Sequence, residues 1–407
     1  MTSLAITARS VESRFRRFVL TVLLCVAPFV VVASMCAWLL YQSDEFAKAR
    51  DVAAYLQDHD AIYGTGVHDV RRQIHFEILR ARTPEIIALG SSRALSFRQE
   101  FFTRPFASAG QALTTLEQGM AFIEAMQDLP PPEVVIFAVD FWWFLQEGGG
   151  TASLKLDGEP RMTVQKLFRP LELIWEGDVT VGELAGLLLP TWLQERAPGP
   201  ERLGLLAKLR GVGIRPDGSL LVGTRLTDKG LETHRQFAEA FADPNRYIAS
   251  TPRYQPDQTI NSDRVTYFVE MIARLQQRGS YVIVVLLPLA PPIYEAFDLD
   301  DGHRYILEIG EALSGVGDES YDLQNPARIG ANSCEFADIH HAGDAAYMKL
   351  LRQIAAENPH SVLREYLDLN ALDEAISANP NRTMARFGTE SEMPVEQDFL
   401  SLGCVKA

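Results

Sequence analysis

Three residues in two distant parts of the chain have the types and spacing of a serine nucleophile with its base. Ser92 lies in the run Gly90-Ser91-Ser92-Arg93, directly after an apolar stretch, and Asp338 precedes His341 by three positions late in the chain. A serine hydroxyl attacks an acyl carbon when a base removes its proton, and a carboxylate can orient that base. The pattern predicts acyl chemistry with Ser92 as nucleophile, His341 as base and Asp338 as orienting group.

Other roles for these residues stay open at this stage. Ser92 would also suit a helix cap, because serine is a common N-cap residue. His340 competes with its neighbour His341 for the role of base, but only His341 has the Asp-x-x-His spacing. We therefore prefer His341 on the motif alone.

The elements that would position these residues alternate between strand and helix. Continuous apolar runs, typical of strands buried on both faces of a parallel sheet, occur at 85–89, 133–139 and 281–287. A weaker strand is expected at 320–324, and 106–110 is expected to be a short loop that follows a weak strand candidate. Helices are expected at 111–128, 262–278, 302–314 and 343–357. This alternation predicts an α/β sandwich with a mostly parallel sheet, in which both motifs meet at the carboxyl ends of the strands.

A membrane anchor is expected near the N-terminus. The stretch 18–41 has 24 residues without a charge, and a helix of that length rises about 36 Å, enough for a hydrocarbon core of about 30 Å. The flanking charges are Arg9, Arg14, Arg16 and Arg17 before it and Asp44 and Glu45 after it. The positive-inside rule then predicts a single-pass inner-membrane protein with residues 1–17 in the cytoplasm and the main domain in the periplasm or outside the cell. A cleaved signal peptide is disfavoured because the apolar run is longer than a signal core.

Composition and cysteine positions narrow the function class. The net charge of −15 in 407 residues argues against a nucleic-acid partner. Cys25 and Cys36 lie in the expected span, which leaves Cys334 and Cys404 as the one pair able to form a disulfide outside the cytoplasm. Their spacing does not match a metal site, and neither a metal nor an organic cofactor is expected.

The remaining segments are assigned by their patterns. Residues 42–82 are expected to form a helical stalk and connector, 83–370 the main domain, and 371–407 a C-terminal tail. Within the main domain, 145–260 break the strand–helix rhythm with Gly148–Gly150, short helical patterns and a hairpin turn at Pro216-Asp217-Gly218. We interpret 145–260 as a helical and hairpin insertion.

Two of these motifs resemble blocks of a known family. Gly90-Ser91-Ser92-Arg93 resembles the first block of the SGNH/GDSL hydrolase family, and Asp338-x-x-His341 resembles its last block. The chain is most similar to membrane-anchored bacterial members related to teichoic-acid D-alanine-transfer and alginate acetylation proteins. The resemblance covers about 60–145 and 262–357, and it implies a three-layer sandwich around a flavodoxin-like sheet.

The resemblance also implies further site residues. The backbone N–H groups of Ser92 and Gly110 are expected to form the oxyanion hole. Asp140 stands where the family usually has asparagine, and an ionised carboxylate there would oppose a developing oxyanion. Arg93, Asp140, Trp142 and Trp143 are candidate substrate-binding residues, although part of the aromatic run is expected to be core.

The implied function is a serine acyltransferase or esterase that adds or removes O-acyl groups on an envelope or exported polysaccharide. An acylated carbohydrate would be its substrate, and a membrane acyltransferase a partner. Two alternatives stay open. One is a non-catalytic binding or assembly component of a polysaccharide-modification complex, and the other is a membrane-tethered scaffold.

Overall fold

A five-stranded parallel sheet forms the centre of the protein in the computed structural model. The model describes residues 2–67, 70–145, 162–177, 179–189, 197–226 and 232–406. The strands are β2 (Ile86–Gly90), β3 (Phe106–Ala109), β4 (Val134–Val139), β8 (Tyr281–Leu286) and β9 (Glu319–Asp322), in the order β3-β2-β4-β8-β9. Every pairing is parallel. The expected α/β class and the strands expected at 85–89, 133–139, 281–287 and 320–324 are therefore confirmed. Residues 106–110, expected to form a loop, instead contain β3, because their backbone pairs in parallel with β2.

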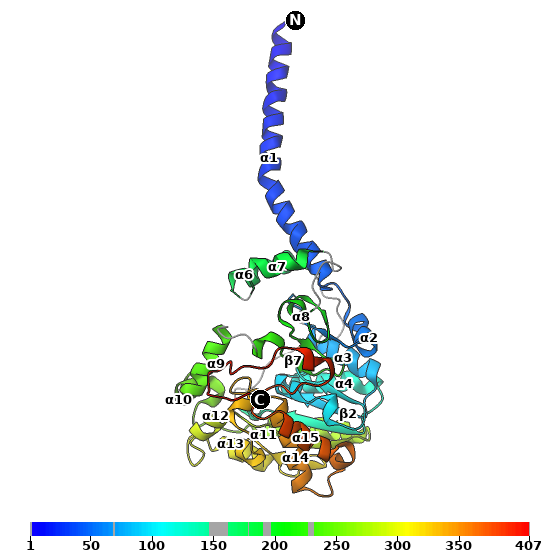
Figure 1. The fold of residues 1–407 in the computed structure, drawn as a ribbon, viewed down its shortest axis with the longest axis vertical. Coiled ribbons are helices and arrows are strands. Elements are labelled where there is room, and N and C mark those ends of the chain that lie inside the picture. The colour runs from blue at the N-terminus through cyan, green and yellow to red at the C-terminus, as the bar shows by residue number, and fades with distance from the viewer. Residues whose placement is uncertain are drawn as a thin grey trace.

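Helices before, between and after these strands contribute apolar residues to the main hydrophobic core. They are α3 (Arg71–Arg82), α4 (Leu116–Ala125), α11 (Ser262–Gln277), α12 (Pro291–Ala296), α13 (Tyr305–Ala312) and α14 (Asp344–Glu357) (Figure 1). Asn261 is the N-cap of α11, and its side chain accepts hydrogen bonds from the N–H groups of Asp263 and Arg264. Its buried residues, Phe268, Met271, Ile272 and Leu275, recur at the spacing of one helical face. Phe268 meets Phe137 of β4 edge to face, with ring centroids 5.0 Å apart.

A second, small sheet joins the beginning of the chain to the middle. Its order is β5 (Glu201–Leu203), β1 (Ala61–Tyr63), β6 (Gly213–Ile214) and β7 (Leu220–Leu221). β6 and β7 form the hairpin that Pro216-Asp217-Gly218 predicted, and Gly218 has the positive φ of +83° that such a turn favours. Between this hairpin and α11, the chain forms α9 (Glu232–Ala242) and α10 (Pro244–Ser250). α10 contacts α12.

Residues 42–82, expected to be a stalk and connector, pack into the folded body. α2 (Ala49–Asp58) lies against α3, and Val52, Leu56 and Ile74 are part of the main hydrophobic core. The reason is the spacing of the apolar residues on α2, which places one buried stripe on the helix. The segment after 370 is packed as well. α15 (Leu369–Ala378) contacts α14, and Ala385 and Phe399 belong to the same core.

One long helix, α1 (Thr2–Gln42), projects from the body (Figure 1). Its segment Arg14–Gln42 is long and apolar enough to cross a membrane, and no other helix in the described ranges is. Pro28 lies inside the helix. Four short helices lie near the end of α1: α5 (Val164–Leu167), α6 (Arg169–Trp175), α7 (Val181–Leu188) and α8 (Leu205–Arg210).

Candidate active site

Ser92 stands at the carboxyl edge of the parallel sheet, where β2 ends. The chain turns at Gly90, and a Cβ on this residue would lie only 2.7 Å from the Ala138 carbonyl oxygen of β4. The short 3₁₀ helix η1 (Ser92–Ser96) follows. The side chain of Ser91 caps η1 by accepting a hydrogen bond from Arg93 N–H at 3.2 Å. Capping is thus the role of Ser91, and the Ser92 hydroxyl is left for another partner.

A compact loop presents Asp338 and His341. The strand-like pairing of Phe336 with Ala342 closes this loop, together with a 2.8 Å hydrogen bond from Ala337 N–H to the His341 carbonyl oxygen. Asp338 Oδ1 accepts hydrogen bonds from the N–H groups of His340 (2.7 Å) and His341 (2.9 Å). Asp338 therefore shapes the loop with one carboxylate oxygen and keeps the other free to contact an imidazole.

The three motif residues form a continuous chain of hydrogen bonds. Ser92 Oγ lies 2.8 Å from Nε2 of His341, and Nδ1 of His341 lies 2.7 Å from Oδ2 of Asp338. The geometry predicted for Ser92, His341 and Asp338 is confirmed. A proton on Nδ1 directed at the carboxylate leaves Nε2 to accept the Ser92 proton. The His341 side chain is 36% exposed, whereas that of Asp338 is 11% exposed.

The local electrostatics favour the ionised form of Asp338 and the protonated form of His341. Burial alone would raise the pKa of Asp338, but the neighbouring His341 and His340, which also donate to it, hold that pKa well below its usual range. Burial alone would lower the pKa of His341, but the Asp338 carboxylate outweighs it and raises that pKa above its ordinary value. Asp338 is therefore ionised at neutral pH, and it stabilises the imidazolium that forms when His341 takes a proton.

Arg93 and Asp140, expected to be candidate substrate ligands, lie in the interior instead. Their side chains are 2% and 0% exposed, and they form an ion pair with Arg93 Nη1 2.9 Å from Asp140 Oδ1. Arg93 also donates from Nε to the His340 carbonyl oxygen (3.0 Å) and from Nη2 to that of Pro288 (2.6 Å). A buried guanidinium needs a counter-charge, and Asp140 supplies it. The Asp140 carboxylate is thereby directed at Arg93.

The two tryptophans of the candidate binding set differ in position. Trp143 is only 2% exposed and belongs to the main core, so it does not face a substrate. Trp142 is half-buried. The guanidinium carbons of Arg93 and Arg253 lie 5.4 and 4.7 Å from its ring centroid. Its ring also meets that of His340 edge to face at 5.8 Å. Trp142 therefore borders the candidate site.

Gly110, expected to supply an oxyanion-hole N–H, has that group engaged elsewhere. Its N–H donates to the hydroxyl of Ser108 at 3.2 Å, and Ser108 donates to the Ala94 carbonyl oxygen at 3.0 Å. A Cβ at 110 would lie 2.7 Å from the Leu95 side chain. Glycine is thus needed here for the close approach of β3 to η1. The Ser92 N–H makes no hydrogen bond to another residue in the described part of the chain, so it remains the available oxyanion donor.

Sequence reasoning missed the tyrosines that hold His340. Tyr254 Oη lies 2.5 Å from His340 Nδ1, and Tyr247 Oη lies 3.2 Å from His340 Nε2. Burial lowers the pKa of His340 to about 3, although Asp338 acts to raise it. His340 is therefore neutral and hydrogen-bonded to tyrosines, which leaves His341 as the candidate base. No local motif marks these tyrosines, because they lie 86 and 93 residues before His340.

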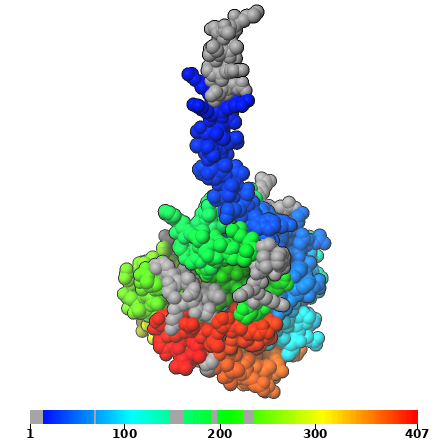
Figure 2. Space-filling view, turned by 45° about the horizontal axis from the view of Figure 1, so that its top comes forward, coloured from blue at the N-terminus to red at the C-terminus, as the bar shows by residue number. Residues whose placement is uncertain are grey.

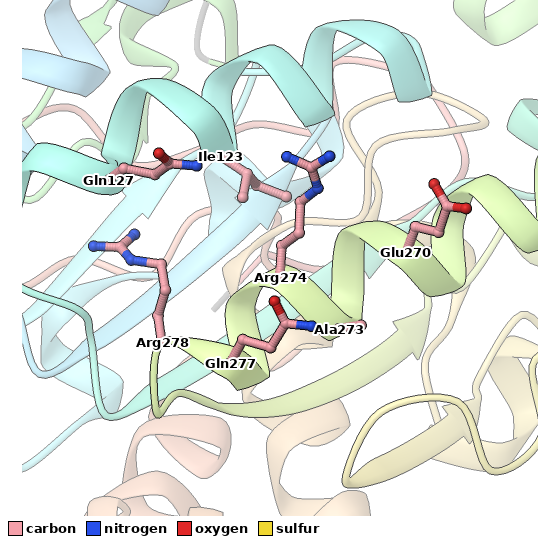
Figure 3. Close-up of a pocket in the computed structure, with 7 residues that line it drawn as sticks. All are labelled: Ile123, Gln127, Glu270, Ala273, Arg274, Gln277 and Arg278. Atoms are coloured by element: carbon pink, nitrogen blue, oxygen red, sulfur yellow. The ribbon is translucent and has the colours of Figure 1, made fainter.

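A separate hollow lies at the opposite edge of the sheet. It occupies about 620 Å³ between α4 and α11, which Figure 3 shows side by side, near the helix ends that lead into β4 and β8. Arg274 of this hollow pairs with Glu124, and Arg278 donates to the Leu129 carbonyl oxygen. These contacts join α11 to α4 and its following loop, and the hollow contains none of the residues near Ser92.

Among the described residues, no cluster of three or more His, Cys, Asp or Glu side chains has the arrangement of a metal site.

The other sequence-predicted contact near the site is present. Cys334 and Cys404 form a disulfide with their Cα atoms 5.7 Å apart, so this prediction is confirmed. The bond joins the end of the chain to the segment four residues before Asp338.

A scan against protein-family models and a search of curated proteins found no match to this chain.

Proposed function

We propose that the chain is a serine acyltransferase or esterase of the SGNH/GDSL type. The observation that carries this proposal is the hydrogen-bonded series Ser92–His341–Asp338, in which Ser92 Oγ lies 2.8 Å from His341 Nε2. The series sits at the carboxyl edge of a parallel sheet, where α/β proteins bind their ligands. A half-buried serine held by a carboxylate-oriented histidine is suited to nucleophilic attack on an ester.

The strand order supports the finer fold assignment that goes with this proposal. Numbered along the chain, the strands of the main sheet lie in the order 2-1-3-4-5, the flavodoxin-like arrangement. The switch point falls between β2 and β4, and Ser92 follows β2. We include in the proposal the SGNH-like three-layer sandwich, with 145–260 as an insertion into it.

The proposed reaction assigns a step to each of these atoms. Ser92 Oγ attacks the acyl carbonyl carbon while His341 Nε2 takes its proton, and the Ser92 N–H donates to the oxyanion. Collapse of the tetrahedral intermediate breaks the ester bond, and the departing alcohol oxygen takes the proton from His341. Water or a second hydroxyl, deprotonated by His341, then attacks the carbonyl carbon of the acyl-serine and bonds to it. The bond from the acyl carbon to Ser92 Oγ breaks, and Ser92 Oγ takes the proton back from His341. Water gives hydrolysis, and a sugar hydroxyl gives transfer.

The substrate class in this proposal is an acylated envelope or exported polysaccharide outside the cytoplasm. Trp142 and Tyr247 border the site with partly exposed rings, and aromatic faces are suited to packing on sugar rings. A span of the length of Arg14–Gln42 would hold the domain at the membrane, beside an acyltransferase that supplies acyl groups. The domain would then work on polymer as the polymer leaves the cell.

A second candidate is a non-catalytic polysaccharide-binding component with the same fold. The engagement of the Gly110 N–H with Ser108 favours it, because the Ser92 N–H is then the one oxyanion donor found at this site among the described residues. An oxyanion hole with fewer donors stabilises the tetrahedral intermediate less.

Reaction with a fluorophosphonate separates the two candidates. The full-length protein in detergent is treated with the probe, and the adduct is located by peptide mapping. We expect one adduct on Ser92, none in Ser92→Ala, and an undiminished adduct in Ser91→Ala. Absence of any adduct under conditions in which a serine esterase reacts completely would favour the binding component.

A further inference from the structure

A group of short helices lies across the body-proximal end of α1. Figure 1 shows α6 and α7 running sideways at the level where α1 reaches the body, and both α5 and α7 contact α1. The contact is apolar, because Leu39 and Leu40 of α1 form a small core with Leu173, Val179 and Leu184. This core is separate from the main core of the domain.

Aromatic residues mark the level at which these helices meet α1. Trp38 and Tyr41 of α1 are 46% and 65% exposed, and their rings stack at 6.0 Å. Tryptophan and tyrosine gather where a membrane span reaches the water interface. Trp38 Nε1 donates to the carbonyl oxygen of Leu188 at 3.4 Å, which places the end of α7 at this aromatic level.

The same helices expose large apolar side chains to the outside. Trp175 is 92% exposed, and four other side chains of this group are also exposed: Val164 (75%), Val181 (67%), Leu189 (47%) and Leu171 (42%). Figure 2 shows this part of the chain on the surface of the body beside the base of α1. Single exposed apolar residues are ordinary, but a group of them on one part of a surface indicates a contact.

Several charged groups of these helices are paired within the protein. Thr180 and Glu183 form a reciprocal cap at the start of α7, and Glu183 also pairs with Arg210 of α8 at 2.6 Å. Arg169 pairs with Glu172 and Glu176 within α6. If the exposed apolar side chains enter a less polar medium, these charges therefore keep a counter-charge when they lose water.

We propose that α5, α6 and α7 lie in the head-group region of the same bilayer that α1 crosses. The occupant of the exposed apolar surface is lipid, because this surface is continuous with the aromatic end of the span. A helix of this kind buries its apolar face about 5–10 Å into the boundary between head groups and acyl chains. The proposal rests on α1 as a membrane span and does not depend on the activity of Ser92.

Such a second contact would fix the orientation of the body. The end of α1 is already tied to it by Glu45, which is fully buried and accepts hydrogen bonds from Thr65 Oγ1 (2.6 Å) and Leu205 N–H (2.7 Å). Lys208 of α8 pairs with Asp44 at 3.1 Å. A body held by one span alone can still tilt against the bilayer. Lipid contact at α6 and α7 removes that freedom and holds the Ser92 edge at a constant position.

Spin labelling of the full chain tests the proposal. Cys25 and Cys36 are replaced by alanine, the Cys334–Cys404 disulfide is kept oxidised, and Trp175→Cys is labelled in protein reconstituted into phospholipid vesicles. Val269→Cys on α11 is the matched control, because Val269 is an exposed apolar residue (42%) far from α1 in the fold. We expect the label at 175 to collide more often with oxygen than with a water-soluble nickel chelate, and the label at 269 to show the reverse.

A second measurement uses the chain without a label. Brominated lipids should quench the fluorescence of Trp175, obtained as the difference between the natural chain and Trp175→Phe. The proposal is overturned if the nickel chelate reaches position 175 as readily as position 269, or if the difference fluorescence is not quenched. Either result, in vesicles that contain no other protein, would assign the apolar surface to a protein partner.

Discussion

The guanidinium of Arg93 and the carboxylate of Asp140 form a buried ion pair directly beside the Ser92–His341 contact. Their atoms lie 2.9 Å apart, and Arg93 also donates to the carbonyl oxygen of His340, the residue before the candidate base. Arg93 thus joins the ends of β2 and β4 to the loop that presents His341. The pair gives the acidic residue that follows β4 a buried cationic partner through Oδ1.

Removing the carboxylate of this pair should strongly destabilise the protein. Asp140→Ala leaves the Arg93 guanidinium buried without a counter-charge, and the expected loss is about 3–5 kcal/mol in the free energy of unfolding. Chemical denaturation of the purified chain in detergent measures it. Glu124→Ala, which breaks the exposed pair with Arg274, serves as the control and should cost less than about 1 kcal/mol. Equal losses in the two variants would contradict a structural role for Asp140.

The two serines after β2 should respond differently to the same substitution. Ser92→Ala removes the proposed nucleophile, so ester hydrolysis should fall by about 10⁴-fold or more with the fold unchanged. Ser91→Ala removes a cap on η1 and should cost about 1 kcal/mol of stability while retaining most activity. Turnover of a chromogenic acetate ester, alongside thermal unfolding, measures both. Full activity in Ser92→Ala would exclude the serine mechanism.

The activity should rise with pH through the titration of His341. A base must be neutral to accept the Ser92 proton, and the Asp338 carboxylate raises the pKa of His341 above its ordinary value of about 6.5. We therefore expect an acid limb whose midpoint lies above that value. His340 contributes no such limb in this range, because burial lowers its pKa to about 3.

The sign of the pH effect can be tested by neutralising Asp338. In Asp338→Asn the burial of His341 is no longer offset by a negative charge, so the pKa of His341 should fall and the midpoint should move to lower pH. The plateau rate should also drop, by about 10⁴-fold, because the tautomer is no longer fixed. Rates of fluorophosphonate labelling across pH measure both effects. A midpoint that stays in place would show that another group controls the limb.

The disulfide should stabilise the end of the chain and the loop with Asp338. Replacing Cys334 and Cys404 by serine opens a loop with a sequence separation of 70, for an expected loss of about 4 kcal/mol in the chain-entropy model. Lys406, which pairs with Glu396 at 2.6 Å, should lose its order at the same time. Denaturation and hydrogen exchange measure these effects. Cys25→Ser on the exposed side of α1 is the control and should leave both unchanged.

The orientation of the anchor is open to a direct test. The arginines before the apolar span predict that the chain after it lies outside the cytoplasm. A reporter enzyme that is active only outside the cytoplasm, fused after residue 407, should therefore be active in the full-length fusion. The same reporter fused before residue 14 should be inactive. The opposite pattern, with both fusions intact, would reverse the orientation.

Local patterns in the sequence determined the central sheet and the first view of the site. The apolar runs that became β2, β4 and β8 are buried on both faces, and such strands need no alternation to be recognised. Ser92 follows one strand directly, and Asp338 and His341 are neighbours within one loop. Each motif could therefore be recognised from a few adjacent residues. The parallel direction of the strands was sufficient to predict that the two motifs lie at the same edge of the sheet.

Only the tertiary structure decided which of the neighbouring polar groups face the site. Asp140 turned to Arg93, the Gly110 N–H to Ser108, and His340 to tyrosines that lie 86 and 93 residues earlier in the chain. The packing of 42–82 into the body was equally non-local. A buried donor, acceptor or charge must find a partner, and that partner is set by which segments meet in space. The spacing of residues along the chain does not predict contacts between distant segments, so these partners are known only from the folded structure.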